Sequence, residues 1–164
     1  MKLKSLTDIG IKRKENQDNY WSALLSVDGS EAGVVCICDG MGGLDDGGLA
    51  SRIVVQDIRD FFKSSIDMNS LMSVLEKSNS IIYNLSSTQE KHMGTTCTVL
   101  LCYKNTYKIL HVGDTRCYKL SSDGSIKVLT KEHSALAKYG ITKKSDPQGY
   151  KKFKNLLTRC IGFK

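Results

Sequence analysis

Gly33-Val-Val-Cys-Ile-Cys-Asp39-Gly-Met-Gly-Gly43 is the stretch of sequence that decides the fold. Its first six residues form a continuous apolar run, which is typical of a β-strand that is buried on both faces. Asp39 follows the run directly, so its carboxylate lies at a strand end. The glycines of the following loop allow backbone carbonyls to approach an ion or a ligand closely. The stretch therefore predicts a strand over residues 33–38 that leads into a candidate binding site.

A second strand and two helices are predicted on either side of this stretch. Residues 18–27 have a strand pattern, and an Asp-Gly pair typical of hairpin turns follows them. Residues 46–65 and 69–88 carry apolar side chains at helical spacing, and Asn69 is a candidate N-cap of the second helix. Because the link between the helices is short, we expect them to be antiparallel neighbours.

Short strands are predicted again in the second half of the chain, over residues 96–103, 107–112, 116–120 and 126–129, with turns at Lys104-Asn105 and Asp123-Gly124. The order of strand pair, helix pair and strand meander indicates an α+β fold whose helices cover one face of a sheet. Residues 140–155 are expected to form an irregular loop around Pro147. The length favours one domain over residues 1–164.

Composition narrows the class of protein. No signal peptide or membrane-spanning stretch is visible, so the cytoplasm is the expected location. In that compartment the six cysteines are expected to be reduced thiols. The net charge is +7, and the lysines are dense in one patch of the sequence. We interpret this patch first as a solvated basic loop and second as a source of positive charge that attracts a phosphorylated substrate. No nucleic-acid motif accompanies the charge, so neither nucleic acid nor a membrane is an expected partner. The patch consists of Lys143, Lys144, Lys151, Lys152 and Lys154.

Five residues carry the most informative chemistry. Asp39 and Asp114 each follow a predicted strand, and Asp18 begins another. Carboxylate oxygens and a backbone carbonyl such as that of Gly40 suit hard divalent cations, Mg²⁺ or Mn²⁺. Arg13 offers a planar guanidinium that suits a phosphate group. Taken singly, each of these residues has an ordinary structural explanation as a turn or surface residue.

Other chemistries fit the sequence less well. The glycine-rich loop has neither the Gly-Lys-Ser/Thr of a Walker motif nor the glycine spacing of a dinucleotide-binding fold. A cysteine-nucleophile phosphatase needs an arginine six positions after the cysteine, and no cysteine here has one. Cys36-Ile-Cys38 lacks a second ligand pair at zinc spacing, so strand core is the better interpretation. His92, His111 and His133 are expected to be structural, and a local site role is the alternative interpretation for His133.

Several motifs taken together and in order resemble the bacterial PPM-type (type 2C), metal-dependent serine/threonine protein phosphatases. The motifs are Arg13-x-x-Asn-Gln-Asp18, Asp39-Gly-Met-Gly-Gly43, Gly94-Thr-Thr96, Val112-Gly-Asp-Thr-Arg116 and Leu157-Thr-Arg-x-Ile-Gly162. The resemblance implies an α-β-β-α sandwich in which paired helices flank two sheets. It also implies two further aspartate motifs after Gly162, so we expect residues 1–164 to hold only the N-terminal and middle parts of the domain, with the sandwich incomplete at the C-terminus.

The resemblance implies a role for each candidate residue. Asp39 would bridge two Mn²⁺ or Mg²⁺ ions, the Gly40 carbonyl would bind one of them, and Asp18 would hold water on the metals. Arg13 would clamp the substrate phosphate, and Asp114 matches the position of a third, weaker metal. The implied reaction is hydrolysis of phosphoserine and phosphothreonine by a metal-activated water. The implied partners are phosphorylated proteins, substrates of a cognate serine/threonine kinase.

Two departures from the family pattern bear on activity. Leu44 and Gly48 stand where the family often has a histidine and an acidic residue. With Asp39 as the central ligand and the later aspartate motifs missing, the chain is expected to bind metal weakly and to turn over slowly. The alternative is a non-catalytic module of the same fold that holds phosphorylated proteins through Arg13 and the basic patch.

Overall fold

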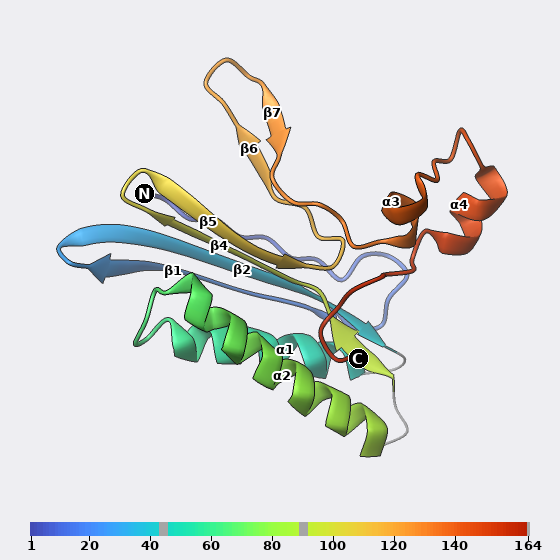
Figure 1. Ribbon diagram of the computed structural model, residues 1–164, viewed down its shortest axis with the longest axis horizontal. Helices are drawn as coiled ribbons and strands as arrows, with labels where there is room; N and C mark the ends of the chain where they lie inside the picture. The colour runs from blue at the N-terminus through green and yellow to red at the C-terminus, as the bar shows by residue number, and fades with distance from the viewer. Residues whose placement is uncertain (43–45, 89–91, 164) are drawn as a thin grey trace.

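The computed structural model describes residues 1–42, 46–88 and 92–163, so Gly43 and Leu44 lie outside the described residues. An antiparallel sheet with the strand order β1-β2-β4-β5 runs along the molecule (Figure 1). The four strands predicted for this sheet are confirmed, and β2 is longer at both ends than the strand predicted over residues 33–38. The strands are β1 Asp18–Val27, β2 Ser30–Gly42, β4 Cys97–Tyr103 and β5 Thr106–Val112, and a short strand, β3 Met93–Thr95, pairs with the end of β2.

Two tight turns fix the register of the sheet. Asp28 and Gly29, between β1 and β2, have φ values of 49° and 72°, and Lys104 and Asn105, between β4 and β5, have values of 46° and 61°. Positive φ at both central residues is the mark of the type I′ hairpin turn, whose twist matches that of the strands. The predicted turns are therefore confirmed. At the far end of the first hairpin, the register places the first residue of β1 opposite Asp39.

Two helices lie over one face of the sheet (Figure 1): α1 Asp46–Phe61 and α2 Met68–Thr88. The core fills the space between this pair and the sheet, with Val54, Ile58, Leu71 and Ile82 among its fully buried side chains. The helix predicted over 46–65 ends at Phe61. Serines follow that end, and their hydroxyls bond to nearby backbone groups, which competes with continuation of the helix.

The N-cap of α2 was wrongly predicted. Asn69 lies inside the first turn, and Asp67 caps the helix instead. The Asp67 carboxylate accepts hydrogen bonds from the backbone N–H groups of Asn69 at 3.0 Å and Ser70 at 3.3 Å. These are the second and third positions of the helix, where an N-cap side chain usually bonds.

We expect Asp67→Ala to lower the midpoint of thermal unfolding at pH 7 by about 2–4 °C, the effect of losing one cap in a domain of this size. Bonds from the Ser70 hydroxyl and the Asn69 N–H lower the pKa of Asp67 below its ordinary value. The stabilisation is therefore present above the pKa of the unfolded chain and lost as the pH falls through the lower folded pKa. Calorimetry at pH 7 and pH 3 checks both points. Asn69→Ala is the control, and an equal loss in that variant would contradict the assignment.

The other side of the sheet carries two projecting segments (Figure 1). One is a hairpin of β6 Tyr118–Leu120 and β7 Ile126–Val128, and the other holds the short helices α3 Ala135–Tyr139 and α4 Pro147–Phe153. The prediction of an irregular loop over 140–155 was wrong in part, because Asp146 caps α4 and Pro147 occupies its first turn, where proline is well tolerated.

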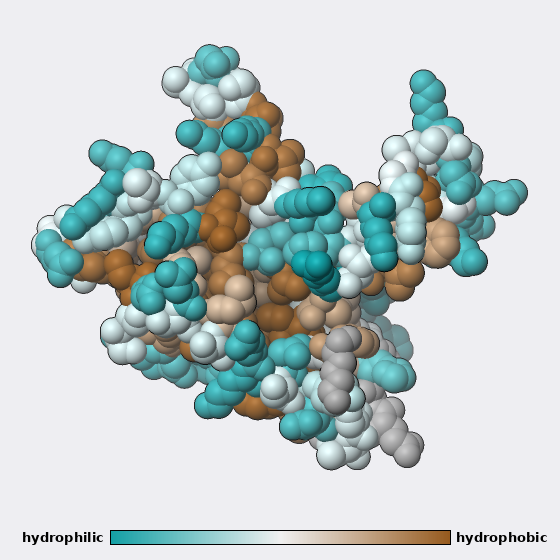
Figure 2. Space-filling model, viewed as in Figure 1, coloured by the Kyte–Doolittle hydropathy of each residue, from teal (hydrophilic) through white to brown (hydrophobic). Residues whose placement is uncertain are grey.

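Figure 2 shows hydrophobic residues gathered over the hairpin and the adjoining sheet. Among the described residues, no helix has the length and apolar character to cross a bilayer.

Candidate metal centre

Two carboxylates face each other across neighbouring strands at one end of the sheet. Asp18 begins β1 and is paired directly with Asp39 on β2. Like charges at directly opposed positions destabilise a strand pair unless a cation lies nearby. The pKa of Asp39 is raised to about 6, first by partial desolvation and then by the carboxylates of Asp18 and Asp114, while the Arg13 guanidinium opposes the shift. The Asp39 side chain still reaches solvent, so repulsion from the neighbouring carboxylates contributes to the raised pKa alongside burial.

The backbone of Asp39 is held in place by two threonines of the Gly94-Thr-Thr96 motif. The Asp39 N–H donates to the Thr96 hydroxyl at 2.9 Å, and the Thr96 N–H donates to the Asp39 carbonyl at 2.9 Å. The Thr95 hydroxyl also donates to that carbonyl, at 3.1 Å. Both threonines are buried, so these bonds are shielded from water. Sequence analysis noted the motif but gave it no role, because its contacts cross 56 or more residues of chain.

Asp114 lies just after β5, in a loop that is tied to the same threonine network. The Thr115 hydroxyl is 2.9 Å from that of Thr96, so the segment carrying Asp114 is linked through Thr96 to Asp39. Gly113 has a φ of +113°, and its N–H donates to His133 Nδ1 at 3.1 Å. His133 thus supports the loop that carries Asp114, which fits the structural role expected for it.

Gly40 lies where several backbones meet. Its N–H donates to the Gln17 carbonyl at 3.2 Å. A Cβ added at Gly40 would lie 2.2 Å from the Gly47 carbonyl oxygen and 2.5 Å from the Gln17 oxygen, so only glycine fits. The Ser51 hydroxyl donates to the same Gln17 carbonyl at 2.6 Å and so joins α1 to the segment that precedes Asp18. The roles of Gln17 and Ser51 as scaffold were missed by sequence analysis.

Arg13 and the carboxylates border two adjoining cavities of about 250 Å³ and 300 Å³. Arg13 and Asp39 line both, Asp18 lines the first, and Asp114 lines the second together with Lys154. The structure therefore brings all five candidate residues to one place, Gly40 included. A larger cavity of about 770 Å³ lies beside it and has a mostly apolar lining without any of the three aspartates, so we place the chemistry in the smaller pair.

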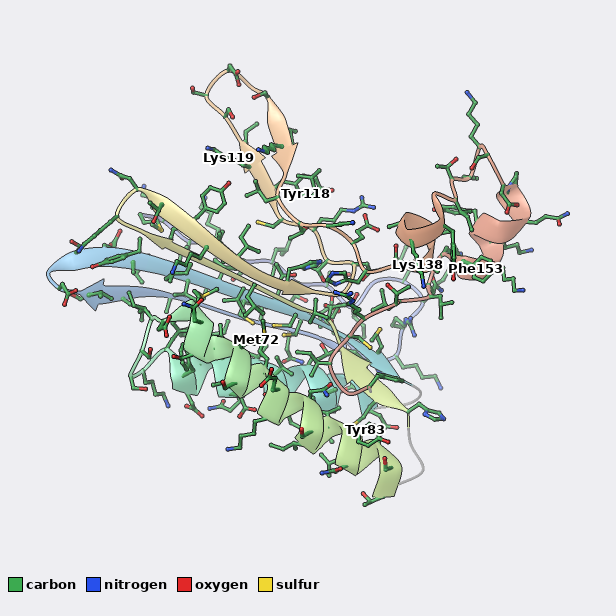
Figure 3. The ribbon with its side chains drawn as sticks, viewed as in Figure 1. Met72, Tyr83, Tyr118, Lys119, Lys138 and Phe153 are labelled. Carbon is green, nitrogen blue, oxygen red and sulfur yellow. The ribbon has the colours of Figure 1, made fainter. Side chains whose placement is uncertain are left out.

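The basic patch is confirmed as a solvent-exposed surface of the α3–α4 segment, and sequence analysis did not foresee that Lys154 also borders the second cavity. Figure 3 labels Lys138 of α3 and Phe153 of α4 on this segment. The rings of Tyr139 and Phe153 lie 6.5 Å apart, which holds the two short helices together. The segment therefore presents positive charge beside the carboxylate cluster.

The cluster offers only oxygen donors from its aspartates and backbone. That donor set, together with opposed carboxylates and a raised pKa, fits hard divalent cations such as Mn²⁺ and Mg²⁺ better than thiophilic ions. An arginine at the rim adds a group that can pair with two phosphate oxygens at once. The arrangement can therefore bind cations and a phosphate ester side by side.

An α+β fold with this carboxylate cluster at the end of an antiparallel sheet defines the class of PPM-type phosphatases. The sequence profile described as protein phosphatase 2C matches residues 11–156, and the chain belongs to that family. It is 31% identical to protein phosphatase PhpP of Streptococcus pneumoniae, over 100% of this chain and 69% of that protein.

Solved structures agree with this assignment. The serine/threonine phosphatase Stp1 from Staphylococcus aureus superposes with a TM-score of 0.77 and 28% identity, over 96% of this chain and 64% of that one. The catalytic domain of the serine/threonine phosphatase PstP, in complex with two manganese ions, gives a TM-score of 0.73 and 25% identity, over 94% and 64%. The chain thus spans about two thirds of the length of these relatives, and the expected PPM-type fold is confirmed.

Proposed function

We propose that the chain is a metal-dependent protein serine/threonine phosphatase that hydrolyses phosphoserine and phosphothreonine. One observation carries the proposal: Asp18 and Asp39 are held directly opposite each other, with Asp114 and Arg13 close enough to act on the same carboxylate. Such a concentration of negative charge is stabilised when divalent cations bind between the carboxylates. The family membership and the manganese-containing relative support the same conclusion.

Each residue of the centre has a proposed task. Asp39 and the Gly40 carbonyl would hold the cations, and Asp18 would orient the attacking water. Bound divalent ions would lower the pKa of water and neutralise charge on the phosphate. Arg13 pairs with the phosphate oxygens and keeps the ester in line for displacement without a phosphorylated enzyme intermediate.

Finer properties belong to the same proposal. We take Mn²⁺ or Mg²⁺ as the two resident ions, and Asp114 would be a ligand of a third. The substrates would be phosphoproteins of a cognate serine/threonine kinase in the cytoplasm. Three carboxylates for two dications are few, so we expect weak binding and slow turnover by these 164 residues.

Hydrolysis of p-nitrophenyl phosphate by this chain with Mn²⁺ tests the proposal. We expect slow turnover that stops on chelation and returns with Mn²⁺. Arg13→Ala should lower kcat/KM by about 10- to 100-fold, because a charge-assisted pair with phosphate is lost. Arg59→Ala, which removes an arginine from the last turn of α1, is the charge-matched control and should behave as the parent chain does. Turnover that survives chelation would refute the metal-dependent mechanism.

The alternative is a non-catalytic module that binds phosphoproteins, which is favoured by the exposed Lys154 lining the same cavity as Arg13. This alternative predicts phosphopeptide binding that survives both chelation and Asp39→Asn but fails in Arg13→Ala. Absence of any Mn²⁺-dependent phosphate release at high enzyme concentration, together with such binding, would replace the first proposal by the second.

A further inference from the structure

Three cysteine thiols meet inside the core, a short distance from the candidate metal centre. Cys36, Cys38 and Cys97 are all fully buried, and their Sγ atoms lie within 4.8 Å of one another. The sulfurs of Cys36 and Cys38 are 3.8 Å apart. We call this group the thiol cluster. None of its members has a task in the proposed phosphatase mechanism.

The sheet explains why the three sulfurs converge. Cys36 and Cys38 are two residues apart on β2, so their side chains leave the same face of the strand. The register pairs Ile37 with Thr98, and the next step along the two strands brings Cys38 opposite Cys97. Ile37 lies between the two cysteines and Asp39 follows them. Both face the other side of β2 and are exposed. The thiol cluster and the carboxylate centre therefore occupy opposite faces of one strand.

The spacing of the sulfurs suits a ligand that bonds to three thiols at once. Metal–sulfur bonds to cysteine are about 2.3 Å long, so three sulfurs around one trigonal atom lie roughly 3–4 Å apart. The thiol cluster is within about 1 Å of that spacing. Among the described residues, these three are the one set of at least three histidine, cysteine or carboxylate ligand atoms that all lie within 4.8 Å of one another, so the three aspartates of the candidate metal centre are more widely spaced than the thiols. A tetrahedral zinc site would need a fourth ligand.

The net charge of the occupied site determines which ligand the thiol cluster can hold. Three thiolates around a monovalent or divalent cation would leave a net negative charge in an apolar core, which is costly without a partner. A trivalent thiophilic atom avoids that cost, because the three thiolates cancel its charge. Arsenous acid is such a ligand, and it is itself uncharged near neutral pH. The reaction balances without any change of oxidation state: three S–H bonds and three As–O bonds break, three As–S bonds form, and three waters leave.

We propose that Cys36, Cys38 and Cys97 form a closed binding site for trivalent arsenic, supplied as arsenite, that bridges β2 and β4. Because the sulfurs are fully buried, the site loads when the chain opens locally or as it folds. The bridge joins the residues next to Asp39 and Thr96, and arsenic binding therefore locks together the two strands that position the carboxylate centre. The proposal does not depend on phosphatase activity.

Refolding the full chain with arsenite in the presence of a phosphine reductant tests the proposal. After gel filtration we expect one arsenic atom per chain by elemental analysis, and native mass spectrometry should show a gain of one arsenic and a loss of three hydrogens. Loaded protein should unfold at a higher temperature, since the folded chain holds the three sulfurs together and binds the ligand more tightly than the unfolded chain does. Wild-type chain that retains no arsenic would overturn the proposal.

Variants locate the site. Cys36→Ala and Cys97→Ala should each weaken arsenite binding by roughly 100-fold, because two sulfurs lose the advantage of a third held in place. Cys102→Ala and Cys160→Ala remove free cysteines outside the thiol cluster and should bind as the wild type does. Two variants of the thiol cluster are used so that the test remains if one of them fails to fold. Circular dichroism checks the fold of each variant. Full binding by a folded Cys36→Ala variant would contradict the proposal.

One further variant separates this site from the phosphatase proposal. Asp39→Asn should retain one arsenic per chain, because Asp39 faces away from the sulfurs. Loss of arsenic in that variant would place the ligand at the carboxylate centre and refute the three-thiol site. Conversely, the failure of Mn²⁺-dependent hydrolysis would leave the arsenic result unchanged, so the two proposals fail independently.

Discussion

Asp39→Asn is expected to lower the affinity of the chain for Mn²⁺ by at least about 100-fold and to remove Mn²⁺-dependent hydrolysis of p-nitrophenyl phosphate. Loss of a residue that only orients a metal ligand typically costs 10- to 100-fold in affinity, and Asp39 is the proposed bridging ligand itself. An amide keeps the shape of the side chain but carries no negative charge for the cation. Titration calorimetry and electron paramagnetic resonance of Mn²⁺ measure the change.

Stability distinguishes the loss of a ligand from the loss of the fold. Metal-free wild type carries opposed carboxylates at Asp18 and Asp39 at pH 7, and the Asp39→Asn substitution relieves that repulsion. The metal-free variant should therefore unfold no earlier than metal-free wild type. Asp28→Asn is the matched control, because Asp28 lies in the turn at the other end of the same hairpin and asparagine tolerates its φ of 49°. Unchanged Mn²⁺ affinity in Asp39→Asn would exclude Asp39 as a ligand.

The positions of the strands and of the candidate ligands could be predicted because their signals are local. Each signal lies within about a dozen residues of sequence. The signals are a continuous apolar run, a residue pair typical of a type I′ turn and an aspartate at the end of a strand. Convergence of Asp18 with Asp39 then follows from the hairpin, since its turn sets the register. Convergence of Asp114 with them had no local signal and rested on the resemblance of the motifs to a family.

Long-range contacts could not be predicted from the sequence. The support of Asp39 by Thr96 and the arrival of Cys97 beside Cys36 depend on how β4 docks against β2 across the inserted helix pair. Two errors were of a different kind, because signals were present but misread. Asp67 was a stronger N-cap candidate than Asn69, and the Asp146-Pro147 pair typically begins a helix rather than a loop.

Gly40→Ala is expected to lower the free energy of unfolding by at least about 3 kcal/mol, near the upper end of the range for overpacked sites. A loss of that size corresponds to a fall of about 6–12 °C in the midpoint of thermal unfolding. The new methyl group would lie 2.2 Å from the Gly47 carbonyl oxygen and 2.5 Å from the Gln17 carbonyl oxygen. Both obstacles are backbone atoms, so rotation of a side chain cannot relieve the clash. Either β2 or the first turn of α1 must shift. Chemical denaturation of the purified variant measures the loss.

The same shift should disable the candidate centre, because Gly40 follows Asp39 directly and its N–H bonds to the residue before Asp18. We therefore expect Mn²⁺ binding to fall together with stability, in contrast to Asp39→Asn, which should lose binding alone. Gly48→Ala is the matched control. Its added methyl group would meet no atom closer than 3.4 Å, and alanine favours the helix, so that variant should be stabilised by about 0.5–1 kcal/mol. A Gly40→Ala protein as stable as the wild type would show that the glycine loop is not constrained by the close packing of these backbones.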